Sequence, residues 1–245
     1  MNCQPTIKTM VYNCTNINQT CLLCDAPAHQ PYPLCMGCEQ ELPWLGDHCP
    51  RCALPLAIDG FLCKGCRRRP PGFRQVVAAW EYAFPIDTLI SRFKHNSQWP
   101  LGRLMAQLLG HVLEHRYSEG LPRPDGLLPV PLARRRLRQR GFNQAAMLAR
   151  WLARQLNLPC CERLLERSRD TPAQQALGAR ARRRNLRQAF SLLPGVDVEG
   201  LHLAVVDDVL TTGATAQAIA HVLRKAGARR VDIYCLARTP RPGQA

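Results

Sequence analysis

The order of apolar and polar residues along the chain changes character near residue 76. From there to the C-terminus, short apolar segments typical of strands alternate with longer amphipathic segments typical of helices. The segments predicted as strands are Val76–Tyr82, Asp125–Pro131, Leu203–Val206 and Val231–Leu236. The segments predicted as helices are Ile86–His95, Leu101–Arg116, Asn143–Leu156 and Ala216–Ala226. Because strands that alternate with helices usually pair in parallel, the pattern predicts an α/β fold with ligand sites at the carboxyl ends of the strands.

A repeated cysteine pattern takes the place of such segments before residue 67. Four Cys-x-x-Cys pairs occur there, and each pair begins fourteen residues after the previous one. Two residues between thiolates let one tight turn present both sulfurs to one metal ion, and two such turns complete a tetrahedron. The predicted zinc ligands are Cys21, Cys24, Cys35, Cys38, Cys49, Cys52, Cys63 and Cys66.

Eight thiolates are enough for two Cys₄ zinc sites. The simplest pairing is sequential, with the first four cysteines on one ion and the last four on the other, although the spacing also permits an interleaved pairing. Four sulfurs leave no coordination position for water, so both sites are predicted to be structural. A segment this short and this poor in apolar residues is not expected to fold without its metal.

An eleven-residue run near the C-terminus combines two acids with three threonines and a glycine. Asp207 and Asp208 are predicted to end a buried strand, and a helix is predicted shortly after them. The turn between the two consists of Thr211, Thr212, Gly213, Ala214 and Thr215. Backbone N–H groups and the positive end of the helix dipole converge at such a turn, so it predicts an anion cradle. The carboxylates before it can accept hydrogen bonds from a sugar diol or hold a hydrated Mg²⁺.

The charge of the chain points to a phosphate-rich ligand as well. The formal net charge is +15, and 29 of the 33 basic residues are arginine. Between Arg123 and Arg187 there are sixteen arginines against four acidic residues, a local net charge of +12. Arginine forks pair with phosphate in a bidentate manner, so this stretch indicates a polyphosphate, a nucleotide or a nucleic acid. The clustering does not distinguish a small polyphosphate from DNA.

The run from Val205 to Thr215 resembles the phosphoribosyl-pyrophosphate (PRPP) motif of the type I phosphoribosyltransferases. The resemblance implies that Asp207 and Asp208 meet the ribose 2′- and 3′-hydroxyls. It also implies that the Thr-Thr-Gly-x-Thr loop holds the 5′-phosphate of PRPP, and that Mg²⁺ bridges the diol and the pyrophosphate.

Two further segments, Pro129–Gln144 and Arg167–Leu177, make the resemblance more specific. Together with the cysteine module and the PRPP motif, they are similar to the ComF/GntX family, bacterial proteins tied to competence and to the use of external DNA. The similarity runs from about Cys21 to Thr239. One departure concerns Lys94, because relatives tend to place an aromatic residue where His95 stands, which weakens a ligand-binding role for this lysine.

The resemblance implies a type I phosphoribosyltransferase-like domain behind a double zinc ribbon. The candidates for its pyrophosphate side are Arg134, Arg138 and Arg140, with Gly141 letting the chain turn after them. The basic segment Arg167–Arg184 is expected to be a mobile loop that closes over the site. No segment marks an acceptor pocket or a general base. Two hypotheses therefore stay open: a Mg²⁺-dependent phosphoribosyltransferase, and a non-catalytic module that binds nucleotides or single-stranded DNA, or that engages DNA-uptake proteins.

The composition also predicts how the chain is organised. We expect a disordered tail over residues 1–20, a zinc module over 21–66, a basic proline-containing linker over 67–75, and the phosphoribosyltransferase-like domain over 76–240. No apolar run approaches the ~20 residues that a membrane span needs. The start of the chain has no signal-peptide pattern, and the cysteine spacing indicates thiolates in a reducing compartment, so a cytoplasmic location is expected.

Overall fold

The structure is a computed structural model that describes residues 19–58, 60–167 and 189–240. The chain divides into two compact units, one ending at Glu41 and the other beginning at Leu42. Most of the predicted tail and of the predicted mobile loop lies outside the described residues. The last two residues of the predicted tail, Gln19–Thr20, form the short strand β1.

The N-terminal unit holds the first two cysteine pairs. Strand β1 pairs antiparallel with β2 (Pro27–Ala28). Helix α1 (Met36–Gln40) follows and begins at Cys35, whose sulfur accepts a hydrogen bond from the backbone N–H of Cys38.

A four-stranded parallel sheet forms the centre of the C-terminal unit. Its strand order is β3-β8-β7-β4, and every neighbouring pair is parallel. The strands are β3 (Val76–Glu81), β8 (Arg230–Arg238), β7 (His202–Leu210) and β4 (Gly126–Pro129). The predicted parallel α/β fold is confirmed.

Strand β7 is longer than the sequence predicts. Asp207 and Asp208 lie within it rather than after it, because pairing with β8 continues through Val209 and Leu210. Leu210 is buried, so the apolar face of the strand extends past the two acids. The pairing of β7 with β8 therefore holds the backbone on both sides of the two acids.

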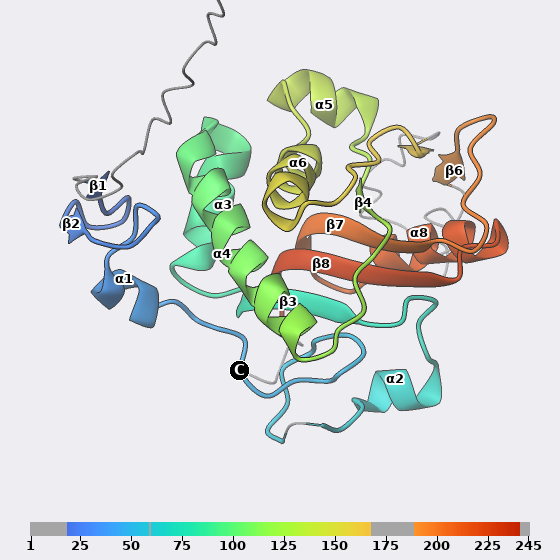
Figure 1. Ribbon diagram of the computed structural model, residues 1–245, viewed down its shortest axis with the longest axis horizontal. Helices are drawn as coiled ribbons and strands as arrows, with labels where there is room; N and C mark the ends of the chain where they lie inside the picture. Colours follow the sequence, from blue (N-terminus) through green and yellow to red (C-terminus); the bar gives the residue numbers. More distant parts are fainter. Residues whose placement is uncertain (1–18, 59, 168–188, 241–245) are drawn as a thin grey trace, which may run out of the picture. The chain divides into compact units, whose positions relative to one another are not determined.

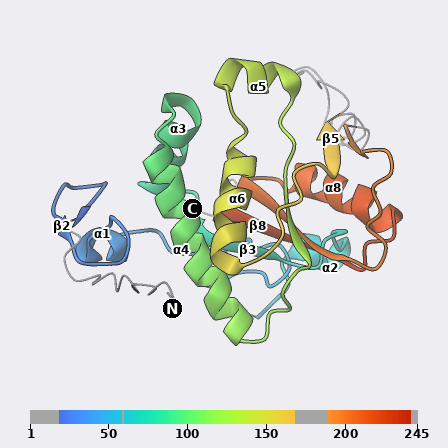
Figure 2. The same ribbon diagram turned by 45° about the horizontal axis from the view of Figure 1, so that its top comes forward.

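Helices cover both faces of this sheet (Figures 1 and 2). Helices α4 (Trp99–Ser118) and α6 (Gln144–Leu156) pack together on one face, where α6 contacts β4 and β7. Helix α8 (Ala214–Lys225) lies on the other face, where Ile219 and Leu223 share a buried cluster with alternate residues of β7 and β8. Helix α3 (Ile86–Asn96) packs against α4.

The arginine-rich segment after β4 is a helix, although it is not among the helices that the sequence predicts. Helix α5 (Arg134–Arg140) has no buried residue. Arginine has a high helix propensity, and this run contains no glycine or proline to interrupt it. The helix ends at Gly141, whose φ of 81° is a left-handed conformation that glycine adopts without strain. Three other short elements were not anticipated: α2 (Lys64–Arg68), β5 (Leu165–Arg167) and β6 (Phe190–Leu192), the last two paired antiparallel.

The second half of the cysteine module belongs to the same compact unit as the sheet. The backbone N–H of Leu45 donates to Ala79 O at 2.9 Å, along the outer edge of β3. The rings of Trp44 and Trp80 lie beside this edge with their centroids 5.3 Å apart. Ala53, just after the third cysteine pair, is fully buried in the core cluster that α8 forms with the sheet. The segment from Leu42 therefore protects an edge strand that would otherwise expose unpaired backbone groups.

Within residues 19–58, 60–167 and 189–240, no helix combines the length and the apolar character that a bilayer span requires.

Candidate ligand and metal sites

The two acids of the predicted PRPP motif lie near the carboxyl end of β7. The Nζ atom of Lys94, on α3, lies 3.0 Å from Asp208 Oδ1. The other carboxylate oxygen of Asp208, Oδ2, is buried and has no hydrogen-bond partner among the described residues. A buried acceptor without a partner costs free energy, so this oxygen is suited to receive a ligand hydroxyl or a metal-bound water.

Asp207 sits in an environment that disfavours its charged form. Burial, together with the adjacent charge of Asp208, raises the pKa of Asp207 to about 8, although Lys94 and the backbone N–H of Asp208 act in the opposite direction. Two neighbouring carboxyls, one of them with a buried oxygen that has no partner, are oxygen donors of the kind that a hydrated Mg²⁺ prefers, so these residues fit that ion.

The loop after β7 is open to solvent. Thr211 and Thr212 are exposed, and helix α8 begins directly after Gly213. Gly213 has a φ of 74°, which favours glycine, and the space in which a side chain would stand is empty. The first N–H of α8, that of Ala214, donates to Thr212 Oγ1 at 3.4 Å, so the helix begins beside exposed threonines, which suits an anion cradle.

The connection from β4 to α6 is held by the polar residues after α5. Asn143 caps α6 by accepting from the backbone N–H groups of Ala145 and Ala146, and its Nδ2 donates to Val130 O at 3.1 Å. The buried side chain of Gln144 accepts a hydrogen bond from Arg140. These contacts fix the end of α5 relative to the end of β4.

Arg140 is the member of the predicted arginine set whose guanidinium interacts electrostatically with Asp208. Burial lowers the pKa of its guanidinium, and the opposite charge of Asp208 counteracts part of that effect. Arg134 and Arg138 are exposed on α5 instead. The structure thus brings Arg140, Lys94 and Asp208 to one place and leaves Arg134 and Arg138 on the helix surface.

Lys94 is the functional candidate that the sequence undervalued. The residue after it departs from the family pattern. Lys94 and Asp208 are also far apart in the sequence, so their contact could not be predicted from local patterns.

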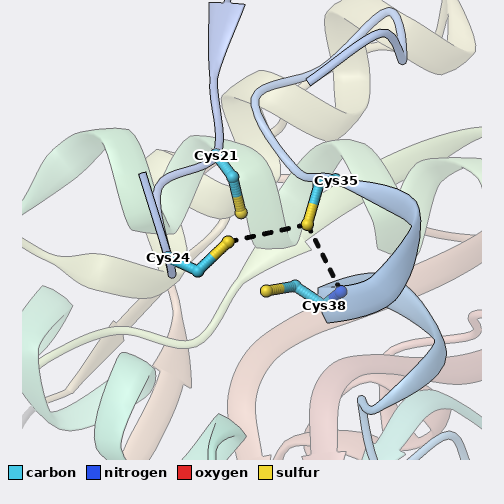
Figure 3. A group of neighbouring side chains, drawn as sticks. All are labelled: Cys21, Cys24, Cys35 and Cys38. Carbon is cyan, nitrogen blue, oxygen red and sulfur yellow. Dashed lines mark hydrogen bonds between the residues drawn. The ribbon is translucent and has the colours of Figure 1, made fainter. Parts of the chain in front are cut away.

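The eight predicted zinc ligands form two clusters in the described residues. The first consists of Cys21, Cys24, Cys35 and Cys38, whose side chains point toward one another (Figure 3). The sulfurs of Cys24 and Cys35 are 3.6 Å apart. Sulfurs of a tetrahedral site with Zn–S bonds of about 2.3 Å lie about 3.8 Å apart, so the cluster fits a zinc ion.

The second cluster consists of Cys49, Cys52, Cys63 and Cys66. The sulfurs of Cys52 and Cys63 are 3.7 Å apart, again a distance that suits tetrahedral zinc. Burial raises the pKa of the Cys49 thiol, but backbone N–H groups, first that of Cys63, outweigh it and bring the pKa down to about 7. The grouping is sequential in both clusters, which decides between the two pairings that the spacing allowed.

Comparisons with known proteins match both halves of this arrangement. Residues 17–69 match the family model described as a double zinc ribbon domain, and residues 143–244 match that of the phosphoribosyl transferase domain. The chain is 38% identical over 222 residues to DNA utilization protein YhgH of Salmonella typhi, covering 89% of this chain and 96% of that protein. This chain belongs to the ComF/GntX family.

A further relative and a solved structure share less sequence with this chain. The chain is 34% identical to Competence protein F of Haemophilus influenzae, covering 90% of this chain and 97% of that protein. Among solved structures, it is similar to the purine phosphoribosyltransferase from Pyrococcus horikoshii, with 18% identity, a TM-score of 0.35, and coverage of 58% of this chain and 78% of that one. The sequence identity to the family members shows the ComF/GntX membership, and the two Cys₄ clusters fit zinc ribbons.

Proposed function

We propose that this ComF/GntX protein binds PRPP at the carboxyl end of β7. Asp207 and Asp208 accept hydrogen bonds from the ribose 2′- and 3′-hydroxyls. The 5′-phosphate occupies the cradle of Thr211, Thr212, Gly213, Ala214 and Thr215. The observation that supports this most directly is the buried, unpartnered Oδ2 of Asp208, held beside Lys94 and next to an exposed threonine loop.

The pyrophosphate of PRPP would lie toward α5. Arg140 is partly buried near Asp208, and the more exposed Arg134 and Arg138 supply further positive charge along the same helix. Gly141 leaves open space beside the turn that ends the helix. Mg²⁺, when bound, neutralises pyrophosphate oxygens and keeps several waters.

The reaction that such a site supports is phosphoribosyl transfer. The bond from ribose C1 to pyrophosphate breaks, a bond from C1 to a nucleobase-like acceptor forms, and the acceptor loses a proton to solvent. The transition state resembles an oxocarbenium ion, so the protein contributes mainly position and charge. The names of the relatives support a role in the use of extracellular DNA, where released bases are acceptors of this class. We also propose a cytoplasmic location, because eight cysteines with the spacing of zinc thiolates suit a reducing compartment.

Calorimetric titration of PRPP, with and without Mg²⁺, tests the binding site. The Asp207→Asn/Asp208→Asn variant should lose at least tenfold in affinity, because each charge-assisted hydrogen bond contributes about 1.5–3 kcal/mol. Glu119→Gln is the matched control, since it removes an exposed carboxylate at the far end of α4. Equal affinity in the control and in the double variant would reject the assignment.

A non-catalytic function has its own supporting observation. Helix α5 exposes Arg134, Arg136 and Arg138 and buries no residue, which suits contact with the phosphates of single-stranded DNA or with a DNA-uptake partner. Under this alternative, alanine substitution of the three arginines would flatten the salt dependence of DNA binding, and PRPP would bind without turnover of any base. Release of pyrophosphate on addition of a nucleobase would instead establish the enzyme.

A further inference from the structure

A second basic site lies at the opposite end of the sheet from the threonine loop. A cavity of about 420 Å³ opens there, at the first residues of β7 and β8. Its charged lining, which we call the arginine cavity, consists of Arg51, Arg74, Arg224, Arg229 and Arg230. Strand β7 separates this cavity from the threonine loop, and its nine residues span about 26 Å at about 3.3 Å per residue.

Three separate parts of the chain supply these arginines. Arg51 comes from the third cysteine pair. Arg74 comes from the segment that leads into β3, where its backbone N–H donates to Val231 O at 2.7 Å. The other three come from the end of α8 and the start of β8. Folding therefore gathers cations around one cavity that are far apart in the sequence.

Little of this positive charge is neutralised within the described residues. Of the five arginines, Arg230 forms an ion pair, with its Nε 3.0 Å from Asp232 Oδ2, and Asp232 also pairs with His202. Arg224 donates to the carbonyls of Ala228 and Arg229. The described residues give Arg51, Arg74 and Arg229 no salt bridge, and Arg51 Nε is buried without a hydrogen-bond partner. No acidic residue lines the cavity.

We propose that the arginine cavity is a second ligand site, which binds the phosphate of a nucleotide. Arginines that line one cavity repel one another, and a phosphate relieves that repulsion while accepting bidentate hydrogen bonds. The volume lies in the range of small-molecule pockets and exceeds what one phosphate group fills. Phe73, Pro122 and Val231 supply an apolar part of the lining, which suits the sugar and base of a nucleotide.

Titration of a 5′-deoxymononucleotide such as dAMP into the full-length, zinc-loaded protein tests this site. The Arg74→Gln/Arg229→Gln variant removes two exposed guanidinium groups from the cavity without disturbing buried packing. The matched control, Arg154→Gln/Arg163→Gln, removes the same charge from exposed positions elsewhere. We expect at least a tenfold loss of dAMP affinity in the cavity variant and less than a twofold change in the control.

Two further titrations identify the source of the phosphate. Inorganic phosphate should bind more weakly than dAMP. A deoxythymidine oligonucleotide should bind to the cavity with an affinity no higher than that of the mononucleotide. Equal affinity of dAMP for the cavity variant and the control would overturn the proposal, as would binding of the oligonucleotide but not of dAMP. PRPP titration of the same variants distinguishes the two sites. The cavity substitutions should leave PRPP affinity unchanged, because the threonine loop lies at the other end of β7. Failure of PRPP to bind at β7 would leave the dAMP result at the cavity unaffected.

Discussion

Arg238 connects the second zinc cluster to the threonine loop, and its removal should weaken both. This last residue of β8 is only 6% exposed. Its Nε donates to Cys52 O at 2.9 Å, and its Nη1 donates to Leu210 O at 2.8 Å and to Thr211 O at 2.6 Å. A third Nη1 contact reaches Thr239 O at 2.6 Å. One side chain therefore donates to the carbonyl of a predicted zinc ligand, Cys52, and to the carbonyls of Leu210 and Thr211 at the start of the threonine loop.

The magnitude follows from these contacts. Hydrogen bonds from a charged donor contribute about 1.5–3 kcal/mol each, and the contributions of four bonds on one group do not add in full. A buried acceptor left without a donor costs about 1–3 kcal/mol. Arg238→Met keeps most of the apolar volume but removes the guanidinium donor from four carbonyls, of which Leu210 O keeps the backbone N–H of Thr239. The free energy of unfolding should therefore fall by about 2–4 kcal/mol.

Urea unfolding measures this loss, and PRPP titration measures its effect on the loop. The Met variant should bind PRPP at least tenfold more weakly, and Arg238→Lys should fall between, because an ammonium cannot reach all four carbonyls in the planar geometry of a guanidinium. Arg154→Met, at an exposed position on α6, is the control. A loss below about 1 kcal/mol in Arg238→Met would refute the network as a source of stability.

Zinc removal tests the connection itself. Chelation should weaken PRPP binding in the wild-type protein, because Cys52 is both a predicted zinc ligand and the carbonyl partner of Arg238. In Arg238→Met that link is already broken, so chelation should have a smaller further effect on affinity. Strictly additive losses would show that the zinc cluster and the loop are independent.

Three other predictions concern the acids and the metal sites. Because the folded-state pKa of Asp207 is raised, its carboxyl group lowers stability progressively as pH rises from about 4 to about 8. Thermal melts of Asp207→Asn should therefore show a gain in stability of about 1–3 kcal/mol over wild type at pH 8 and no difference near pH 3. Lys94→Met should raise the pKa of Asp207 further and so move the pH dependence of Mg²⁺·PRPP binding upward, since Lys94 favours the charged carboxylate. Metal analysis should find two zinc ions per chain in the wild type and one in Cys24→Ser, whose PRPP affinity should stay unchanged.

Each of these has a clear contrary result. A stability difference between wild type and Asp207→Asn that does not vary with pH would contradict the raised pKa. A binding profile of Lys94→Met that coincides with wild type would mean that the lysine does not act on the acids. Zinc content near zero in protein purified under reducing conditions would reject the two Cys₄ sites.

Local patterns in the sequence were enough for the parallel α/β fold and for the zinc ligands. The spacing of each Cys-x-x-Cys pair fixes two sulfurs on one turn, and the run from Asp207 to Thr215 places acids, threonines and a helix start within nine residues. Such features depend on neighbours along the chain, so their chemistry can be read without knowing the fold. The exact end of β7 could not be predicted from the sequence, because Val209 and Leu210 remain in the strand only through their pairing with β8.

Contacts between distant residues were decided by the tertiary structure alone. Lys94 reaches Asp208, Arg140 approaches the same acid, and Arg238 reaches the carbonyl of Cys52 across 186 residues of sequence. The arginine cavity likewise is lined by a residue of the third cysteine pair and by residues at the start of β8. Parallel pairing aligns the ends of strands that are remote in sequence, and burial of the apolar faces then fixes which polar groups meet at those ends.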